Sequence, residues 1–140
     1  MLLNGEEVRN IRQKPWWMYC IPWLMGNTCV ALYPHFYVSK RIYKDLTSKS
    51  PSPKSVAVAL HELEHLKRAH TFGVFKYYAL YLLSRRFRFE EEMACKAIEI
   101  RYLRERGETL DLERVSRILS GWAYLWCTSY AEALKRLQAI

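Results

Sequence analysis

The residues best suited to chemistry in this chain are His61, Glu62 and His65, in the segment HELEH, an H-E-x-x-H pattern. Positions i and i+4 of a helix lie on one face, so the imidazoles of His61 and His65 can bind one metal ion. Glu62 is rotated by roughly 100° from His61, and its carboxylate can therefore reach a metal-bound water rather than the metal. We predict that His61 and His65 are metal ligands on one helix.

The chemistry that this arrangement predicts is metal-assisted hydrolysis of an amide. Zinc lowers the pKa of a bound water to near neutrality, and Glu62 can accept its proton and pass it to the leaving amine. The chain has 4 His among 140 residues, and with this composition the pattern arises by chance in roughly 1% of chains. The competing interpretation is an exposed polar helix face with two ordinary histidines.

A catalytic zinc needs three protein ligands and one open position, so a third ligand has to come from elsewhere in the chain. One arrangement is H-E-x-x-H-x-x-G-x-x-H, but Arg68 and Thr71 stand at its glycine and last histidine positions. His70 is separated from His61 by about 900° of helix and points to the opposite side. The other arrangement takes a glutamate from a later helix, and the acidic run at 90–92 is available there.

These two motifs together resemble the gluzincin family of zinc metallopeptidases, in which H-E-x-x-H is followed by E-x-x-A on a downstream helix. Here the second motif is Glu91-Glu92-Met93-Ala94, with Cys95 where many relatives carry Asp. The short length, the strand pair before the first motif and the aromatic-rich helix between the motifs look like the minimal single-domain members, the minigluzincins. The resemblance covers roughly residues 28 to 105.

Carried over by position, the resemblance implies one catalytic Zn²⁺ bound by His61, His65 and Glu91, with Glu62 as the general base. Within the acidic run, Glu90 and Glu91 share the helix face of Ala94, whereas Glu92 points roughly 100° further round. We therefore expect Glu91 as the third ligand, with Glu90 as the second choice. The alternative is that this acidic run only stabilises a helix N-terminus through the helix dipole.

The same resemblance implies how a substrate binds. A peptide or protein substrate would add as a strand to the edge of a small sheet, here Thr28 to Val38. Relatives stabilise the oxyanion with a Tyr, His or Arg, and the candidates by residue type are Tyr124, Tyr130 and His70. Minimal relatives place their own C-terminal segment in the cleft, so residues 119–140 are a candidate inhibitory segment of a latent, zymogen-like form.

The elements that must position these residues follow from apolar periodicity and turn residues. Residues 28–33 and 36–38 are β-branched or aromatic and flank a turn at Pro34, which predicts a strand pair. Helices are expected over about 53–70, 74–84, 89–106 and 111–119 and after Ser129, the first of them capped by Ser52 and the third ending at Gly107. The predicted fold is α+β: a small antiparallel sheet of two to three strands, followed by a helical body that carries the H-E-x-x-H helix.

Length and composition are those of a single domain spanning residues 1–140, and the resemblance implies that this domain is zincin-like. Hydrophobic residues make up 51% and charged residues 26% of the chain, which excludes a disordered protein. The apolar stretches 16–25 and 72–83 are shorter than the ~20 residues of a membrane span, and docking of either at a membrane surface is the minority alternative. The start of the chain lacks an apolar run, so we expect a cytoplasmic protein with reduced cysteines.

Net charge is +8, and the basic groups at 40–44 and 85–88 are interleaved with aromatic residues. This combination favours a second class of function, a non-enzymatic nucleic-acid-binding or regulatory module. No helix-turn-helix, RRM or zinc-finger pattern accompanies it, so we expect a solvated basic face and no specific nucleic acid. Chelators should abolish the function of a zinc peptidase, whereas salt should abolish polyanion binding.

Overall fold

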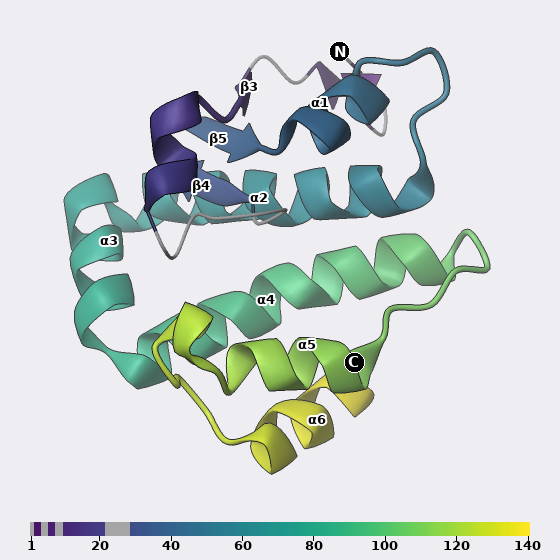
Figure 1. The fold of residues 1–140 in the computed structure, drawn as a ribbon. Coiled ribbons are helices and arrows are strands. Elements are labelled where there is room, and N and C mark those ends of the chain that lie inside the picture. Colours follow the sequence, from purple (N-terminus) through teal and green to yellow (C-terminus); the bar gives the residue numbers. More distant parts are fainter. Residues whose placement is uncertain (1, 4–5, 8–9, 22–28) are drawn as a thin grey trace.

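The small sheet and the helices at 16–20 and 40–46 lie on one side of the H-E-x-x-H helix, and the helices after residue 84 lie on its other side (Figure 1). The helix at 74–83 connects these two layers at one end (Figure 1). The computed structural model describes residues 2–3, 6–7, 10–21 and 29–140. Within them the fold is α+β, as predicted. The strands are β1 (Leu2–Leu3), β2 (Glu6–Glu7), β3 (Ile11–Gln13), β4 (Val30–Leu32) and β5 (His35–Val38). The helices are η1 (Trp16–Cys20), α1 (Lys40–Leu46), α2 (Pro53–Phe72), α3 (Val74–Leu83), α4 (Arg85–Arg104), α5 (Leu112–Leu119), η3 (Trp122–Tyr124) and α6 (Tyr130–Gln138).

The main sheet has the strand order β3-β5-β4, which leaves β4 at an edge. β4 and β5 pair antiparallel, as the sequence predicts, and Ala31 lies opposite Phe36. β3 pairs parallel with β5, so the sheet is mixed rather than purely antiparallel. The side chains of Phe36 and Val38 are fully buried because alternate residues of β5 point toward α2.

Helix boundaries follow local capping chemistry. The hydroxyl of Ser52 accepts a hydrogen bond from the backbone of Ser55 at the start of α2, and Ser129 accepts one from Glu132 at the start of α6. Gly107 has φ 69°, as expected for the residue that ends a helix in the left-handed region. α4 begins at Arg85, earlier than predicted, because Ser84 caps it. α1 was not predicted.

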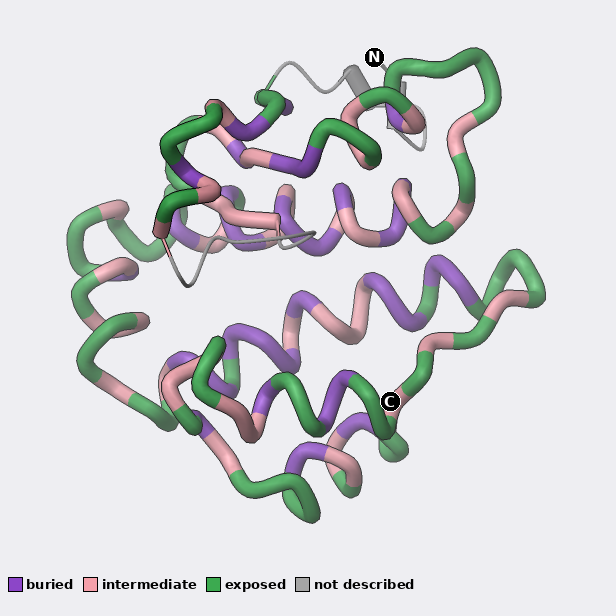
Figure 2. Tube along the Cα trace, viewed as in Figure 1, coloured by how far each residue is buried: buried purple, intermediate pink, exposed green. Residues whose placement is uncertain are grey.

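Two apolar clusters hold the layers together. The first lies between the sheet and α2 and extends to the C-terminal end of α4 through Tyr102 and Leu103. The second lies between α4 and the α5–α6 pair, around Met93, Leu119 and Leu137. Figure 2 shows α2 and α4 with buried positions along their length, whereas α3 is mostly exposed or half-buried. α4 is therefore packed on both faces, and its orientation relative to α2 is determined by both clusters.

Among the described residues, we find no helix with the length and hydrophobicity needed to cross a membrane. The four cysteines all lie in the described part of the chain and are unpaired.

Candidate metal centre

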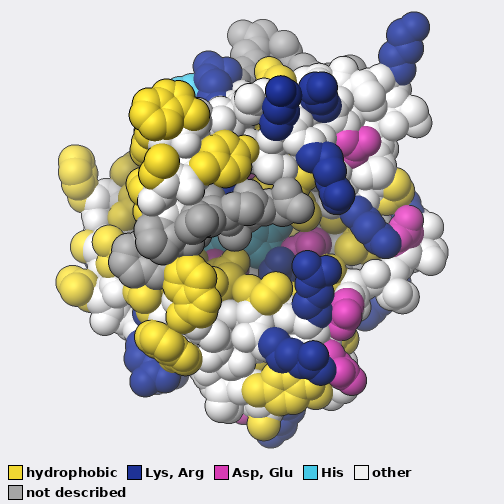
Figure 3. Space-filling model, viewed as in Figure 1, with side chains coloured by type: hydrophobic (Ala, Val, Ile, Leu, Met, Phe, Trp, Pro, Cys, Tyr) yellow, Lys and Arg dark blue, Asp and Glu magenta, His cyan; other side chains and the backbone are white. Residues whose placement is uncertain are grey.

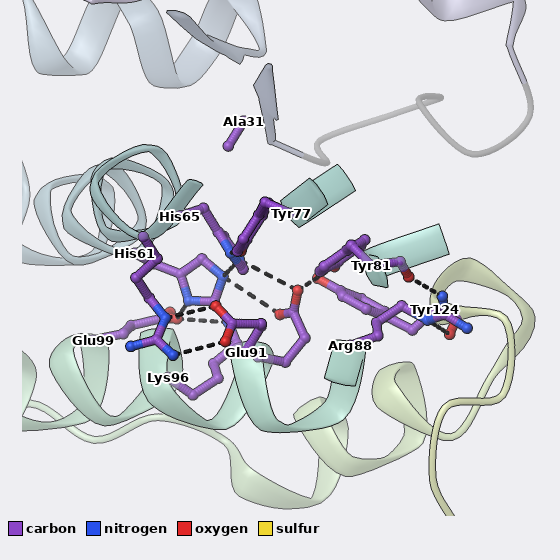
Figure 4. Close-up of polar contacts among 12 residues, drawn as sticks. Ala31, His61, His65, Tyr77, Tyr81, Arg88, Glu91, Lys96, Glu99 and Tyr124 are labelled. Atoms are coloured by element: carbon purple, nitrogen blue, oxygen red, sulfur yellow. Dashed lines mark hydrogen bonds and ion pairs between the residues drawn. The ribbon is translucent and has the colours of Figure 1, made fainter. Parts of the chain in front are cut away.

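Three side chains converge between α2 and α4 (Figure 4). His61 and His65 come from α2, and Glu92 comes from α4; all three are buried. The two Nε2 atoms are 3.2 Å apart. Glu92 Oε2 lies 3.5 Å from Nε2 of His61, and Glu92 Oε1 lies 3.3 Å from Nε2 of His65. The group could hold a metal ion, because all its ligand atoms lie within 4.8 Å of one another.

These distances fit a tetrahedral ion. With ligand bonds near 2.0–2.1 Å, neighbouring donor atoms of a tetrahedral zinc site lie about 3.3 Å apart. Glu92 Oε2 is also buried without a hydrogen-bond partner among the described residues. A buried carboxylate oxygen with no partner is costly, and a cation at this point would satisfy it.

The structure places Glu92, and not the predicted Glu91, in the group with the two histidines. Glu91 forms a two-pronged ion pair with Arg68 of α2, at 2.6 and 2.7 Å, on the flank of the α2–α4 interface. The second choice, Glu90, lies on the far side of α4 and pairs with Arg136 of α6. Glu91 was predicted because it shares the helix face of Ala94, and this face does not meet the histidines.

A signal for Glu92 was nevertheless present in the sequence. Glu92, Lys96, Glu99 and Leu103 follow one another at i, i+4, i+7 and i+11, which places them along one line of a helix. Leu103 is apolar, so this line had to face the interior, and it carries the two glutamates with it. The structure buries both glutamates and Leu103 against α2 and its neighbours.

Outer contacts hold the three ligands in orientation. Nδ1 of His65 is hydrogen-bonded to the hydroxyl of Tyr77 at 2.9 Å, and the hydroxyl of Tyr81 donates a short hydrogen bond to Glu92. Nδ1 of His61 lies 3.4 Å from the carboxylate of Glu99. A hydrogen bond at Nδ1, as in His65, leaves Nε2 to bind a metal ion. Nδ1 of His61 has the contact with Glu99 but no hydrogen bond to the described residues. The sequence analysis did not identify these outer residues.

Burial and the neighbouring glutamate carboxylates have the largest effects on the pKa values of this group. Burial lowers the pKa of His61, but Glu92 and Glu99 outweigh it and raise that pKa to about 9. Burial raises the pKa of Glu92, but both histidines outweigh it and hold that pKa well below its usual value. Glu99 has a pKa of about 2 because Lys96 and His61 outweigh its burial. A pKa of about 9 keeps His61 protonated near neutral pH, so the charges of this centre are paired with one another.

Glu62 lies beside the ligand group and lines the same cavity. The cavity has a volume of about 520 Å³ and is bounded by β4, α2, α3 and the η3 segment. Its walls are mainly apolar and aromatic, and its ionisable lining residues besides tyrosines and Cys29 are His61, Glu62, His65, Arg88 and Glu92. Burial raises the pKa of Glu62, a direction typical of carboxylates that act as acids or bases.

One wall of the cavity is the edge strand β4. The hydroxyl of Tyr78 donates to the carbonyl of Ala31 at 3.1 Å and accepts from the backbone N–H of Tyr33 at 2.8 Å. These backbone groups point away from β5, on the side where an added strand would pair. Gly73, with φ 93°, permits the sharp turn from α2 that brings α3 and Tyr78 to this position. A chain pairing with Ala31 has to displace the Tyr78 hydroxyl.

Of the predicted oxyanion candidates, Tyr124 lines the cavity. The carboxylate of Glu92, followed by burial, raises the pKa of the Tyr124 phenol, so it stays protonated and able to donate. Tyr130 begins α6, and His70 stacks on Tyr33; neither lines the cavity. The predicted inhibitory segment divides in two: residues 123–125 line the cavity, whereas α6 packs against α5 and α4. Whether the segment inhibits stays a prediction.

No family model, curated protein or solved structure matches the chain. The functional class proposed below therefore depends on the geometry of the site alone.

Proposed function

We propose that the protein is a zinc-dependent metallopeptidase in which His61, His65 and Glu92 hold the metal and Glu62 is the general base. The observation that carries the proposal is the set of donor separations, 3.2, 3.3 and 3.5 Å, on an H-E-x-x-H helix. Three protein ligands with a cavity on the open side are the arrangement of a catalytic rather than a structural zinc.

A Zn²⁺ ion held there would supply Lewis-acid polarisation of a substrate carbonyl and a coordinated water of near-neutral pKa. Glu62 would accept a proton from the attacking water and deliver it to the leaving amine nitrogen. Tyr124 would donate a hydrogen bond to the developing oxyanion. The apolar cavity walls would exclude bulk water and receive an apolar side chain of the substrate.

The substrate that fits this cavity is an extended peptide. β4 is an edge strand and its residues Val30, Ala31 and Leu32 line the cavity above the histidines. A peptide that adds to this edge brings a backbone carbonyl toward the ligand group while its alternate side chains enter the apolar cavity.

The first test is metal content by elemental mass spectrometry. The wild type should hold one zinc per chain, and His61→Ala/His65→Ala should hold none. His70→Ala is the matched control, because His70 lies on the same helix outside the ligand group, and it should retain zinc. Absence of zinc from the reconstituted wild type would overturn the proposal.

The second test separates metal binding from chemistry. Glu62→Gln should retain zinc but lower the rate of cleavage of an unfolded protein substrate by about 10²–10⁴-fold. Glu64→Gln, on the same helix, should leave the rate unchanged. Cleavage products are measured by mass spectrometry, with a chelator-treated sample as the blank. Equal cleavage by wild type and Glu62→Gln would remove Glu62 from the mechanism.

A further inference from the structure

α3 has its polarity reversed relative to an ordinary surface helix. Its inward side carries the tyrosine hydroxyls that contact His65, Ala31 and Glu92. Its outward side carries Phe75, Ala79, Leu82 and Leu83, exposed at the i, i+4, i+7 and i+8 positions of one helical stripe. Phe75 is 93% exposed and Leu83 86% exposed. An apolar stripe of this kind on the outside of a helix marks a contact surface.

Exposed tryptophans lie on both sides of this stripe. Trp16 of η1 is 80% exposed, and Trp122 and Trp126 of the η3 segment are also exposed. Figure 3 shows hydrophobic side chains gathered over η1, α3 and η3, along the left side of the view. The guanidinium of Arg85 donates to the carbonyl of Trp126 and ties the η3 segment to the end of α3. We call Trp16, Phe75, Leu82, Leu83, Trp122 and Trp126 the apolar rim.

The apolar rim borders one side of the cavity (Figure 3). Leu82 lines the cavity and is also 65% exposed, so it belongs to both surfaces. Leu32 of β4 also lines the cavity and is exposed. Ala123 and Leu125 line the cavity next to the exposed tryptophans Trp122 and Trp126 in the sequence. Whatever covers the apolar rim therefore also meets the opening of the candidate metal centre.

The chain segments that carry the apolar rim have no acidic residues of their own, although the exposed Glu90 interacts with Arg86. The segments 8–44, 66–89 and 114–131 contain η1, α3 and η3 respectively, and none of them has an Asp or Glu. Lys76, Arg85 and Arg86 are exposed on α3 and at the start of α4. The surface of a protein partner usually carries charges of both signs, so only part of it would complement this apolar and basic surface. An anionic lipid surface complements both the apolar and the basic groups.

We propose that the apolar rim docks on an anionic membrane surface. Phe75, Leu82 and Leu83 enter the acyl boundary, and the tryptophans lie at headgroup level, where their amphipathic rings are most stable. Lys76 and Arg86 contact lipid phosphates. α3 has 10 residues, so it lies in the interface and does not cross it.

Docking turns the opening of the cavity toward the membrane. If the proposed peptidase function holds, its substrates are extended polypeptide segments at the membrane surface. This last step rests on the proposed function, whereas the docking itself does not.

The test is co-sedimentation with vesicles, which requires no enzymatic activity. The protein should bind vesicles of phosphatidylglycerol and phosphatidylcholine, with a blue shift of tryptophan emission, and should bind pure phosphatidylcholine vesicles at least tenfold more weakly. Raised salt should weaken the binding, because it screens exposed charges. Equal binding to both vesicles, or binding to neither, would overturn the proposal.

Two pairs of variants assign the binding surface. Phe75→Ser/Leu83→Ser should lower vesicle binding by at least tenfold, because both changes remove apolar side chains that would be buried among the lipids. Tyr130→Ser on α6 should not lower it. Lys76→Glu/Arg86→Glu should abolish the preference for anionic vesicles, whereas Lys44→Glu/Lys49→Glu, with the same change in net charge, should keep it. Equal loss in the control variants would refute the assignment.

A second copy of this chain is the alternative occupant, and it is measured directly. Light scattering coupled to size exclusion should report the same mass for the wild type and for Phe75→Ser/Leu83→Ser. A dimer that this double variant dissociates would overturn membrane docking. Glu62→Gln should bind vesicles as the wild type does, so failure of docking and failure of the peptidase proposal are distinguishable.

Discussion

The two halves of the α2–α4 interface differ in polarity, although the same pair of helices forms both. In one half, Ala57 and Ala59 of α2 and Leu103 of α4 belong to a continuous apolar core. In the other half, His61 and His65 face Glu92, and the interface is filled with charge. The apolar half gains stability from burial, and that gain holds the charged half at the spacing that a metal ion requires.

Pairing of charges explains why the side chains of the charged half are buried. Charged side chains are rarely buried unless they are paired. Here Glu92 is paired with the histidines and Tyr81, Glu99 with Lys96, and Glu91 with Arg68. The ligand group is therefore preorganised, with each carboxylate oxygen of Glu92 facing one histidine Nε2.

The largest expected effect comes from removing the charged half's third ligand. Glu92→Gln should lower zinc affinity by more than about a hundredfold, beyond the range of an outer contact. Glu91→Gln is the matched control: it breaks the ion pair with Arg68 and should leave zinc affinity nearly unchanged. Both are measured by competition with a chromophoric chelator. The reverse order would return the ligand role to Glu91.

A substitution in the apolar half should lower the stability of the fold rather than the affinity for zinc. Leu103→Ala should lower the free energy of unfolding by about 2–5 kcal/mol, the range for truncation of a buried leucine. Urea denaturation of the metal-free protein measures this loss. The folded variant should still bind one zinc per chain; loss of zinc from a fully folded Leu103→Ala protein would show that the two halves are not separable.

An intermediate effect on zinc affinity is expected at Glu99, which contacts a proposed ligand without belonging to the ligand group. Glu99 lies beside Nδ1 of His61, and Glu99→Gln should lower zinc affinity by about 10–100-fold while one zinc per chain is retained. The same competition assay measures it. An affinity equal to that of the wild type would mean that Glu99 only neutralises Lys96.

A smaller effect is expected at the cavity wall. Tyr78→Phe removes the hydroxyl that occupies the outer edge of β4, so under the proposed function KM for an extended peptide should fall by about two- to tenfold with kcat unchanged. Tyr43→Phe, on α1, is the matched control. A rise in KM would show that Tyr78 holds the edge strand in its binding conformation instead.

The smallest effect is expected at the far side of α4. Glu90 pairs with Arg136, and both side chains are nearly half exposed. Glu90→Gln should change the free energy of unfolding by less than about 1 kcal/mol, and by less still at raised salt. Thermal denaturation at two salt concentrations measures the change. Zinc affinity should not respond.

Much of this protein was determined by sequence alone. The spacing of His61 and His65 placed both imidazoles on one helix face, and Ser52, Gly107 and Ser129 marked helix ends, because caps and helical periodicity are local properties. The strand pair before α2 followed from β-branched and aromatic residues on either side of Pro34.

The tertiary structure decided which neighbours these local elements meet. Local periodicity shows that Glu91 and Glu92 lie about 100° apart on a helix, but not which of them faces α2. That rotation of α4 results from the burial of Leu103 on one side and Met93 on the other. The placement of Tyr77 and Tyr81 against the ligands likewise required the turn at Gly73 and the packing of α3 across two helices, which are long-range contacts that no local pattern encodes.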